Sequence, residues 1–420
     1  MLKRETDVPK ITIPPEAELL LCCARKSIDP ECAERIRSIV LRGIDWVYLF
    51  RLAISNGLIS FLYSGLNSAC PDIVPQGTLG QLRNQFEINL KRSRYLTKEL
   101  TALLNLFDRH GILAVPFKGP TLAVSVYGNL SLRQFSDLDI MVRKQDVLAA
   151  RASLISQGYK HKLLADGGEK TTRLAPENVY QLIRDDGKVI VEIHWGLAPD
   201  YFSFPFELES YMESLQYISL EGSQALTFKP EDLLLILCMH GGKHRWERLD
   251  WICDVSELVR SHSEMDWAEV IKQARAMGVE RMLYLGLALT NRFFQTALPQ
   301  EVLERIGRLP VITRLVEEVN RRFYCEDIGP PGLFETPFTI EGIKMADAYF
   351  HLRARERLRD KSRYCLHLFY LALKPNGRDQ AIVSLPAAFS LLYYPLRPVR
   401  LINRYWLRAI KRVLAQMRGY

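Results

Sequence analysis

Two aspartates, one residue apart, stand out in the apolar segment 137–142, which reads DLDIMV. In a β-strand, successive side chains point to opposite faces, so Asp137 and Asp139 would project from one face and Leu138 from the other. Two carboxylates about 6 to 7 Å apart on one face repel each other and contribute nothing to packing. A divalent cation relieves this repulsion, and Mg²⁺ in such sites takes its remaining ligands from water and substrate phosphates. The pair therefore predicts a magnesium site.

A third carboxylate lies in another apolar segment, 189–195, which reads VIVEIHW. An unpaired carboxylate is costly to bury among β-forming residues, so Glu192 needs either a partner or an exposed position. If its strand lies beside the aspartate strand, Glu192 joins Asp137 and Asp139 in a cluster of three acids. In the alternative interpretation, Glu192 faces solvent from a half-exposed strand.

The residues just upstream of the aspartates predict a phosphate site. Residues 112–117 have the character of a buried strand, and Gly119 follows Lys118 immediately afterwards. Pro120 suits the first position of a helix, because its missing N–H costs nothing there. A strand, a glycine and a helix start in succession direct free backbone N–H groups at an anion, and glycine lets the anion approach the main chain. Lys118 or Thr121 would then contact the phosphate.

A second polar group follows in the segment CMHGGKHRWERLDWICD. His240 and His244 have the i, i+4 spacing of a helical zinc pair, but the two glycines between them disfavour a continuous helix. Three interpretations remain open: zinc ligands, a connection between helices with exposed basic side chains, or one wall of a substrate cleft. We favour the cleft, because the glycines permit close approach and the nearby Lys243 and Arg248 carry positive charge.

Periodicity and turn residues predict the elements that must position these side chains. Helices are expected where apolar residues recur every three or four positions, and strands where they alternate. The turn from Asp185 to Gly187 predicts a β-hairpin of the Asp-Gly type. The expected helices occupy much of residues 15–65, then 79–110, 144–157 and 266–322, and the expected strands are 112–117, 137–142, one that opens at Gly158, 179–184 and 189–195.

Length and composition narrow the class of protein. The chain has 420 residues, enough for two or three compact units, with an ordinary apolar share of 48%. No apolar run reaches the roughly eighteen residues of a transmembrane helix, and the N-terminus lacks the apolar stretch of a secretory signal. The eight cysteines show neither a CxxC pair nor zinc spacing, which indicates buried thiols in a reducing cytosol. The formal net charge of +8 permits an anionic partner without naming one.

The order of these features resembles a known enzyme superfamily. A strand, a glycine turn, a helix, an Asp-x-Asp strand and a later strand with one acidic residue together resemble the polymerase-β-type nucleotidyltransferases. More narrowly, FKGPTLAVSVYGNLSLRQFSDLDIMV, VEIHW and CMHGGKHRWERLDWICDVSEL resemble a poorly characterised bacterial nucleotidyltransferase family, over about residues 20–290. The resemblance implies an α+β fold with a polymerase-β-like core and a small mixed sheet. We expect a helical region at 1–110, the α/β core at 111–229, a helical domain that closes the cleft at 230–340 and a basic helical tail at 341–420.

The resemblance also implies roles for the acids and for the glycine turn. Asp137, Asp139 and Glu192 would bind two Mg²⁺ ions, and the turn from Lys118 to Thr121 would hold a triphosphate. The superfamily usually has Gly-Gly or Gly-Ser at this turn. Here Lys118, Gly119 and Pro120 stand in its place, so the hydroxyl expected to touch phosphate is missing from its usual position.

On the opposite side of the cleft, the resemblance implies a wall formed by the second polar group. Its members would be His240, Lys243, Arg248 and Asp254, with Lys243 reaching phosphate. After Glu192, the side chains of the HW pair would either contact the nucleobase or belong to the core.

The chemistry that follows is transfer of a nucleotide. An acceptor hydroxyl or other nucleophile would attack the α-phosphorus of a nucleoside triphosphate in line, and pyrophosphate would leave. Either Asp139 or Glu192 would act as the base. The acceptor, whether a small molecule, sugar, peptide or protein, is not encoded in any motif, and neither is the nucleobase. The alternative is a nucleotide-binding or regulatory protein that keeps the fold without turnover.

The last part of the chain is basic and aromatic, from Arg353 to Arg363 and again from Arg397 to Arg412, with the proline-broken apolar segment 381–396 between them. Three interpretations compete for this tail. A basic amphipathic helix can lie on an anionic membrane surface, a basic aromatic face can bind nucleic acid, and a solvated flank can simply pack on the helices. With the cysteine pattern described above, we expect a cytoplasmic protein. The tail adds peripheral contact with an anionic membrane as an alternative.

Overall fold

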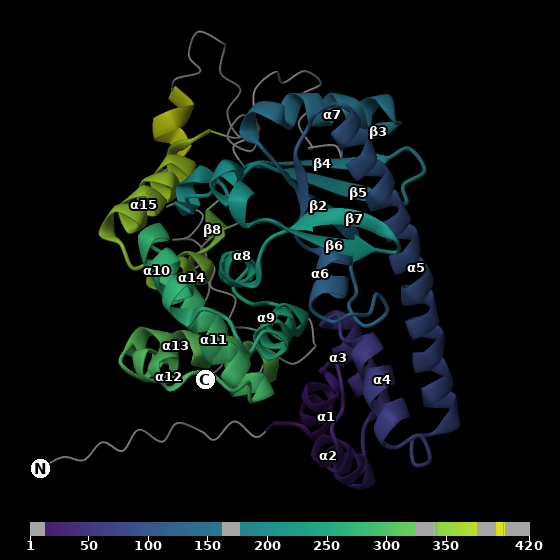
Figure 1. The fold of residues 1–420 in the computed structure, drawn as a ribbon. Helices are drawn as coiled ribbons and strands as arrows, with labels where there is room; N and C mark the ends of the chain where they lie inside the picture. Colours follow the sequence, from purple (N-terminus) through teal and green to yellow (C-terminus); the bar gives the residue numbers. More distant parts are fainter. Residues whose placement is uncertain are drawn as a thin grey trace, which may run out of the picture. The chain divides into compact units, whose positions relative to one another are not determined.

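The computed structural model describes residues 13–161, 177–324, 339–340, 343–375, 392–397 and 399. The chain divides into two compact units, residues 1–326 and 327–420. The fold is mainly helical with a small mixed sheet (Figure 1), so the predicted α+β class is confirmed. The finer divisions predicted within the first unit stay a prediction.

Helices make up the first part of unit 1. Asp29 caps the second helix by accepting a hydrogen bond from the Cys32 backbone N–H, and Asp45 caps the third in the same way. A long amphipathic helix follows, close to its predicted bounds. The five helices are α1 (Pro15–Cys23), α2 (Pro30–Leu41), α3 (Trp46–Ser55), α4 (Ile59–Ala69) and α5 (Gln76–Arg109).

A five-stranded sheet comes next, in the order β1-β2-β5-β4-β3. β2 and β5 are parallel neighbours, while the other pairs are antiparallel. The predicted Asp-Gly hairpin is confirmed as β4 and β5. The strands are β1 (Ala114–Pro116), β2 (Asp137–Val142), β3 (Tyr159–His161), β4 (Val179–Arg184) and β5 (Ile190–His194), and the helices between them are α6 (Gly119–Ser125), η1 (Lys144–Asp146) and α7 (Val147–Ser156).

One face of this sheet is the core of the unit. Leu138 and Ile140 of β2 are buried there with Val191 of β5, against apolar side chains of α5 and α7. Figure 1 shows these two helices beside the sheet. Because side chains alternate along a strand, the residues between them project from the other face. The predicted separation of the aspartates from Leu138 is therefore confirmed.

The rest of the described part of unit 1 contains a small hairpin, six α-helices and two short 3-10 helices. The hairpin of β6 (Gln216–Leu220) and β7 (Ser223–Thr227) was not predicted, whereas the helical character of residues 266–322 is confirmed. The remaining elements are η2 (Asp200–Phe202), η3 (Leu208–Ser214), α8 (Pro230–Lys243), α9 (Leu249–Ser261), α10 (Trp267–Met277), α11 (Glu280–Phe294), α12 (Gln300–Gly307) and α13 (Pro310–Tyr324).

The expected weakening of the helix at its two glycines is wrong. α8 runs through Gly241 and Gly242 to Lys243. A Cβ at Gly241 would overlap the ring of Trp246, which is fully buried, and a Cβ at Gly242 would lie 3.2 Å from the sulfur of Met282. The glycines thus allow close side-chain packing against the helix, and that contact outweighs their low helix propensity.

Unit 2 contains β8 (Thr339–Ile340), β9 (Ile343–Lys344), α14 (Met345–Ala354) and α15 (Leu358–Leu373). Most of the predicted apolar segment and the basic residues 400–412 lie outside the described residues. No helix in the described part of the chain is long and apolar enough to span a membrane. Six described cysteines are buried as expected, but Cys365 on α15 is exposed, so the prediction of buried thiols is wrong for that residue.

Candidate active site

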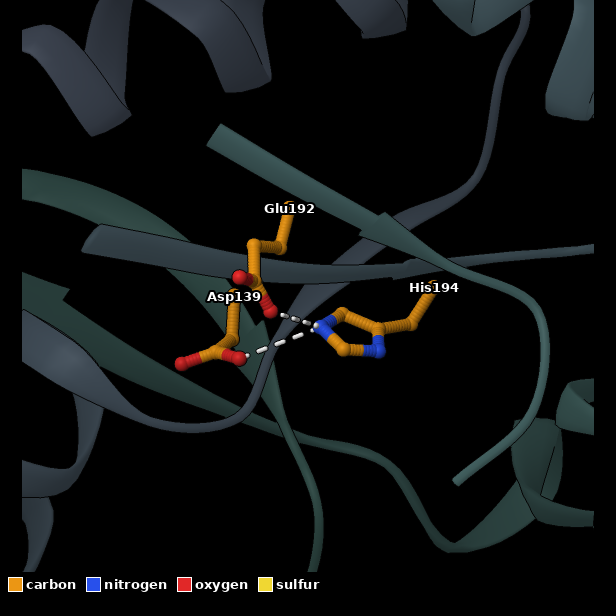
Figure 2. Close-up of side chains that lie close together, drawn as sticks. All are labelled: Asp139, Glu192 and His194. Atoms are coloured by element: carbon orange, nitrogen blue, oxygen red, sulfur yellow. Dashed lines mark hydrogen bonds and ion pairs between the residues drawn. The ribbon is translucent and has the colours of Figure 1, made fainter. Parts of the chain in front are cut away.

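The parallel pairing of β2 with β5 brings two of the predicted acids together. Asp139 lies directly opposite Glu192 in the register, and Asp137 lies opposite Ile190. Asp139 and Glu192 project from the sheet face that α5 and α7 leave uncovered. His194, two residues beyond Glu192 on β5, projects from the same face (Figure 2). Residues more than fifty positions apart in the chain therefore meet on neighbouring strands.

His194 connects the two carboxylates. Its Nε2 lies 3.1 Å from Oδ1 of Asp139 and 3.2 Å from Oε2 of Glu192 (Figure 2). Gln181 of β4 donates a 2.6 Å hydrogen bond to the other oxygen of Glu192. One ligand atom from each of Asp139, Glu192 and His194 lies within 4.8 Å of the other two, and within the described residues this is the only such group. The arrangement can hold a metal ion.

Electrostatics distinguish the three acids. Burial, together with the charges of Asp139 and Glu192, raises the pKa of Asp137 to about 6. Burial would also raise the pKa of Asp139, but the charge of Lys118 and the hydrogen bond from His194 outweigh it and hold this pKa well below its usual range. Burial would likewise raise the pKa of Glu192, but the hydrogen bond and the charge of His194 outweigh burial, so this pKa is lowered. Negative charge is thus in surplus at Asp137.

The predicted phosphate turn lies against the same strand. Lys118 Nζ is 3.5 Å from Oδ1 of Asp139. Gly119 has φ +56°, and a Cβ there would lie 3.4 Å from the carbonyl oxygen of Asp137, so the turn runs close beside β2. Pro120 and Thr121 are buried, and the Thr121 hydroxyl has no hydrogen-bond partner among the described residues.

The end of α8 faces Lys118 and the acids. Lys118 Nζ lies 3.1 Å from Nδ1 of His240. Burial and the charge of Lys118 hold the pKa of His240 well below its usual range. Burial and Lys118 also lower the pKa of Lys243, while the charges of Glu192 and Asp139 act in the opposite direction. Lys118, Lys243 and His240 therefore lie near the carboxylates, and their role as a cleft wall stays a prediction.

Arg248 lies further along this wall and has a different partner. Its guanidinium donates to both oxygens of Asp250, at 3.1 and 2.6 Å, and lies 5.8 Å from the ring centroid of Trp251. The rings of His240 and His244 are 5.1 and 5.3 Å from Trp251. The two histidines thus pack in an aromatic group with Trp251. The described residues give no support to a zinc pair at this position.

Asp254 does not line the cleft that the resemblance implied. It is buried and accepts two hydrogen bonds from Nε of Arg133, at 2.9 and 3.1 Å, and one from Nη2 at 2.9 Å. Tyr127 donates a further 2.9 Å hydrogen bond to it. The charge of Arg133 is also a minor influence on the two aspartates. It adds to the lowering of the Asp139 pKa and slightly offsets the raising of the Asp137 pKa.

Sequence reasoning missed two residues at this site, Trp251 and Arg133, and the contact that a third, His194, makes with the acids. The bond of His194 to the acids, the ring of Trp251 and the charge of Arg133 all depend on contacts between distant segments, and no local spacing indicates them. Of the two interpretations of Trp195, nucleobase contact or core, the structure supports the core. The residue is buried there, and its ring centroid lies 5.0 Å from that of Tyr180. His194 instead lies on the face of the acids.

The sequence profile of a family described as uncharacterised nucleotidyltransferase matches residues 42–295, more than half of the chain. The chain belongs to this family. No curated protein matches it. A solved structure, the antigenic nucleotidyltransferase-like protein from Paracoccidioides brasiliensis, is similar at 13% identity over 53% of this chain and 92% of that chain, with a TM-score of 0.28. A TM-score this low does not establish a shared fold.

The profile match includes every part of the candidate site. Residues 42–295 contain the turn at Lys118, both acid-bearing strands and the wall formed by α8 and α9. The carboxylates, the lysines and the aromatic group thus all belong to the part of the chain that carries the family membership.

Proposed function

We propose that this protein transfers a nucleoside monophosphate from a nucleoside triphosphate to a hydroxyl or other nucleophile of an acceptor, with Mg²⁺ as the metal. The acceptor class includes small molecules, sugars, peptides and proteins. The single observation that carries the proposal is the β2–β5 register, which puts Asp139 beside Glu192 on the sheet face that α5 and α7 do not cover. Membership of the nucleotidyltransferase family supports the reaction class.

The acids fit the proposed metal. Carboxylate oxygens are the ligands that Mg²⁺ prefers. Burial and the charges of Asp139 and Glu192 raise the pKa of Asp137, and a bound cation would favour its charged form. Asp137, Asp139 and Glu192 would hold two Mg²⁺ ions, which when bound stabilise the leaving pyrophosphate and lower the pKa of the acceptor hydroxyl. His194 would keep Asp139 and Glu192 oriented through its N–H, as a positioning residue.

The basic wall would bind the phosphates. Lys118 would exchange its 3.5 Å contact with Asp139 for a phosphate oxygen, and Lys243 would contact the triphosphate from α8. The turn from Gly119 to Thr121 would supply backbone N–H groups, and Arg248 would act at the outer side of the wall. The two lysines would therefore position the triphosphate and balance its charge.

Of the two candidate bases, the geometry favours Glu192. Its side chain is 22% exposed, against 8% for Asp139, and its carboxylate shares one hydrogen-bond donor, His194, with the other acid. An acceptor entering from solvent would therefore reach Glu192 first. Asp139 would remain a metal ligand held by Lys118 and His194.

A second candidate function is nucleotide binding without turnover, as in a regulatory protein. It is favoured by the contacts of Lys118 and His194, which supply Asp139 with positive charge and a hydrogen bond from within the protein. Such a protein would bind a triphosphate through its lysines and would release no pyrophosphate.

Calorimetric titration with ATP, CTP, GTP and UTP, with and without Mg²⁺, tests the binding step. We expect Mg²⁺-dependent binding of at least one triphosphate, weakened about tenfold or more in Asp139→Asn. Asp108→Asn is the matched control, because Asp108 is exposed at the end of α5, away from the sheet face. Binding that is indifferent both to Mg²⁺ and to Asp139→Asn would contradict the proposal.

Mass spectrometry of a cell extract incubated with the protein and labelled triphosphates tests the transfer step. Nucleotide-labelled products that require the wild-type protein, together with pyrophosphate release, support the transferase. Metal-dependent binding without any labelled product supports the second candidate instead.

A further inference from the structure

A cavity of about 150 Å³ lies in unit 1 between α1, α2 and the ends of α11 and α13. None of the residues that line it belongs to the candidate active site. Three arginines from separate elements reach it: Arg25 follows α1, Arg35 lies on α2 and Arg292 lies near the end of α11. Glu18 is the only acidic residue among the described residues that line it. The lining therefore carries a surplus of two positive charges.

The partners of these arginines leave donors free for a ligand. Arg35 donates to Oε1 of Glu18 from Nε and Nη2, at 3.2 and 2.9 Å. The nearest acid to Arg25 is Asp29, whose carboxylate lies 3.8 Å from Nη1, longer than a hydrogen bond. The Nε of Arg25 is buried without a hydrogen-bond partner among the described residues. The Arg25 side chain as a whole is 23% exposed, so its terminal guanidinium nitrogens can reach a ligand in the cavity.

The rest of the lining is apolar and aromatic. Cys22 and Leu21 of α1 contribute one side. Phe293 and Tyr324 contribute another, with their rings stacked at 5.9 Å between centroids. Cationic groups beside an apolar wall suit a ligand that has both an anionic group and an apolar body.

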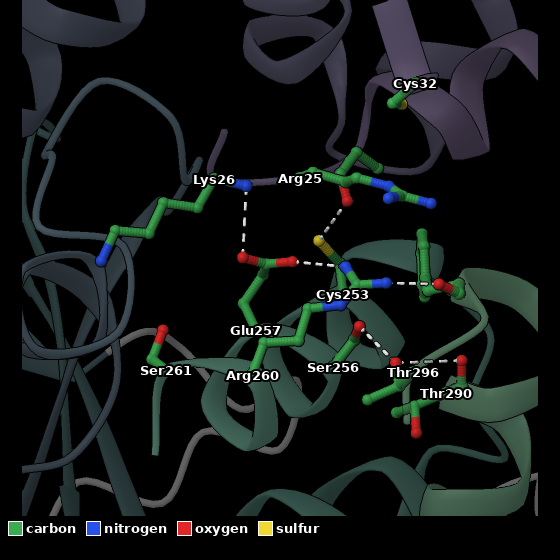
Figure 3. Close-up of polar contacts among 12 residues, drawn as sticks. Arg25, Lys26, Cys32, Cys253, Ser256, Glu257, Arg260, Ser261, Thr290 and Thr296 are labelled. Carbon is green, nitrogen blue, oxygen red and sulfur yellow. Dashed lines mark hydrogen bonds and ion pairs between the residues drawn. The ribbon is translucent and has the colours of Figure 1, made fainter. Parts of the chain in front are cut away.

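The segment that carries Arg25 is held in place by α9 (Figure 3). The backbone N–H of Lys26 donates to Oε2 of Glu257 at 3.2 Å, and Arg260 donates to the other oxygen at 2.7 Å. Arg260 also donates to the carbonyl oxygen of Phe294, next to the cavity lining. The Cys253 thiol donates to the carbonyl oxygen of Ala24 at 3.4 Å. One polar network therefore fixes both sides of the cavity, so little ordering would be needed on binding.

We propose that this cavity binds a small organic carboxylate with an apolar body about the size of a benzene ring. A carboxylate takes parallel hydrogen bonds from a guanidinium, and Arg25 and Arg292 bring two guanidinium groups to the lining. An empty volume of this size accommodates benzene in an apolar protein interior. Inorganic phosphate would satisfy the arginines but leave the aromatic wall uncovered.

Calorimetric titration of the full chain with benzoate, in the absence of nucleotide and Mg²⁺, tests this proposal. We expect saturable binding of benzoate, and binding about tenfold weaker or more for neutral benzyl alcohol and for inorganic phosphate. Arg292→Gln should weaken benzoate binding about tenfold, because it removes an exposed cationic group from the lining without disturbing the core. Arg25→Gln should weaken it at least as much.

The matched control is Arg83→Gln, which removes an exposed arginine of α5 that pairs with Glu87. It should leave benzoate binding unchanged. Urea unfolding of each variant without ligand shows whether the fold is intact. Three results would overturn the proposal: no saturation with benzoate up to about 10 mM, equal effects of Arg83→Gln and Arg292→Gln, or phosphate binding as tight as benzoate. Since no nucleotide is present, failure here leaves the proposed function untouched.

Discussion

Two buried polar groups in unit 1 balance their charges in different ways. Between Arg133 and Asp254, one guanidinium meets one carboxylate in three hydrogen bonds, and Tyr127 donates a fourth. The side chains of the pair are 8% and 2% exposed. Every charge there has its partner within the protein, so the group needs nothing from outside and serves to hold α9 to the segment before β2.

The acids on the sheet face opposite α5 and α7 lack this balance. Lys118 and His194 contact the carboxylate of Asp139, and His194 also contacts that of Glu192. For Asp137, burial and the charges of the two neighbouring acids raise the pKa to about 6. A protein gains no stability from an acid in that position, whereas a cation-binding site requires it. The contrast teaches that burial alone does not identify a functional charge. The proposed function assigns the role to the acid whose charge the surrounding residues balance least.

Breaking the balanced pair should have the largest effect on stability. Arg133→Met leaves Asp254 buried without its countercharge, so we expect the free energy of unfolding to fall by about 3 to 5 kcal/mol. Urea unfolding monitored by circular dichroism measures it. The double variant Arg133→Met/Asp254→Leu should recover much of the loss, because both charges are then absent.

That double variant decides the interpretation of the first result. Recovery shows that the stranded carboxylate caused the loss. A double variant as unstable as Arg133→Met alone would mean that the arginine acts through packing of its stem rather than through its charge.

Asp137→Asn should have a smaller effect of opposite sign. The folded-state pKa of about 6 lies above the roughly 3.9 of an unfolded aspartate, so the metal-free protein loses stability as the pH rises between these values. Asparagine removes that loss. We expect the variant to be more stable than the wild type by about 1 to 3 kcal/mol near pH 8, with a smaller difference near pH 5. Asp250, whose pKa burial also raises to about 6, is present in both proteins and cancels in the difference.

Added Mg²⁺ should reverse the order of these two proteins. If the proposed metal site is correct, Mg²⁺ raises the free energy of unfolding of the wild type more than that of Asp137→Asn. Asp108→Asn should respond as the wild type does. An Asp137→Asn protein that is less stable than the wild type near pH 8 would show that the charge of Asp137 is balanced after all.

The sequence predicted the local half of this comparison. Alternation around Leu138 placed both aspartates on one face, and the Asp-Gly turn predicted the hairpin that carries Glu192. Whether that strand lies beside β2 could only be posed as a condition, because strand neighbours far apart in the chain leave no local signal. For the same reason the sequence could not show that Arg133 pairs with Asp254, 121 residues away.

Two local errors have physical causes. Gly241 looked like a helix breaker, because the close packing of Trp246 on it is visible only in three dimensions. The β6–β7 hairpin was not predicted. Its tight two-residue turn consists of Glu221 and Gly222, which both have positive φ in the structure. Its strands are partly exposed and mostly polar, so they lack the clean alternation that marked β2 and β5.

The smallest effect should come from an exposed pair with equally good geometry. Arg37 of α2 and Asp72 form two parallel hydrogen bonds, one of them 2.8 Å long, but their side chains are 37% and 57% exposed. Water screens the attraction and competes for both groups, so Arg37→Gln should leave the urea midpoint within experimental error of the wild type. A double-mutant cycle with Asp72→Asn, repeated in about 0.5 M salt, measures the remaining coupling, which salt should remove. Coupling as strong as that of Arg133 with Asp254 would mean that hydrogen-bond geometry, rather than burial, sets the worth of an ion pair in this protein.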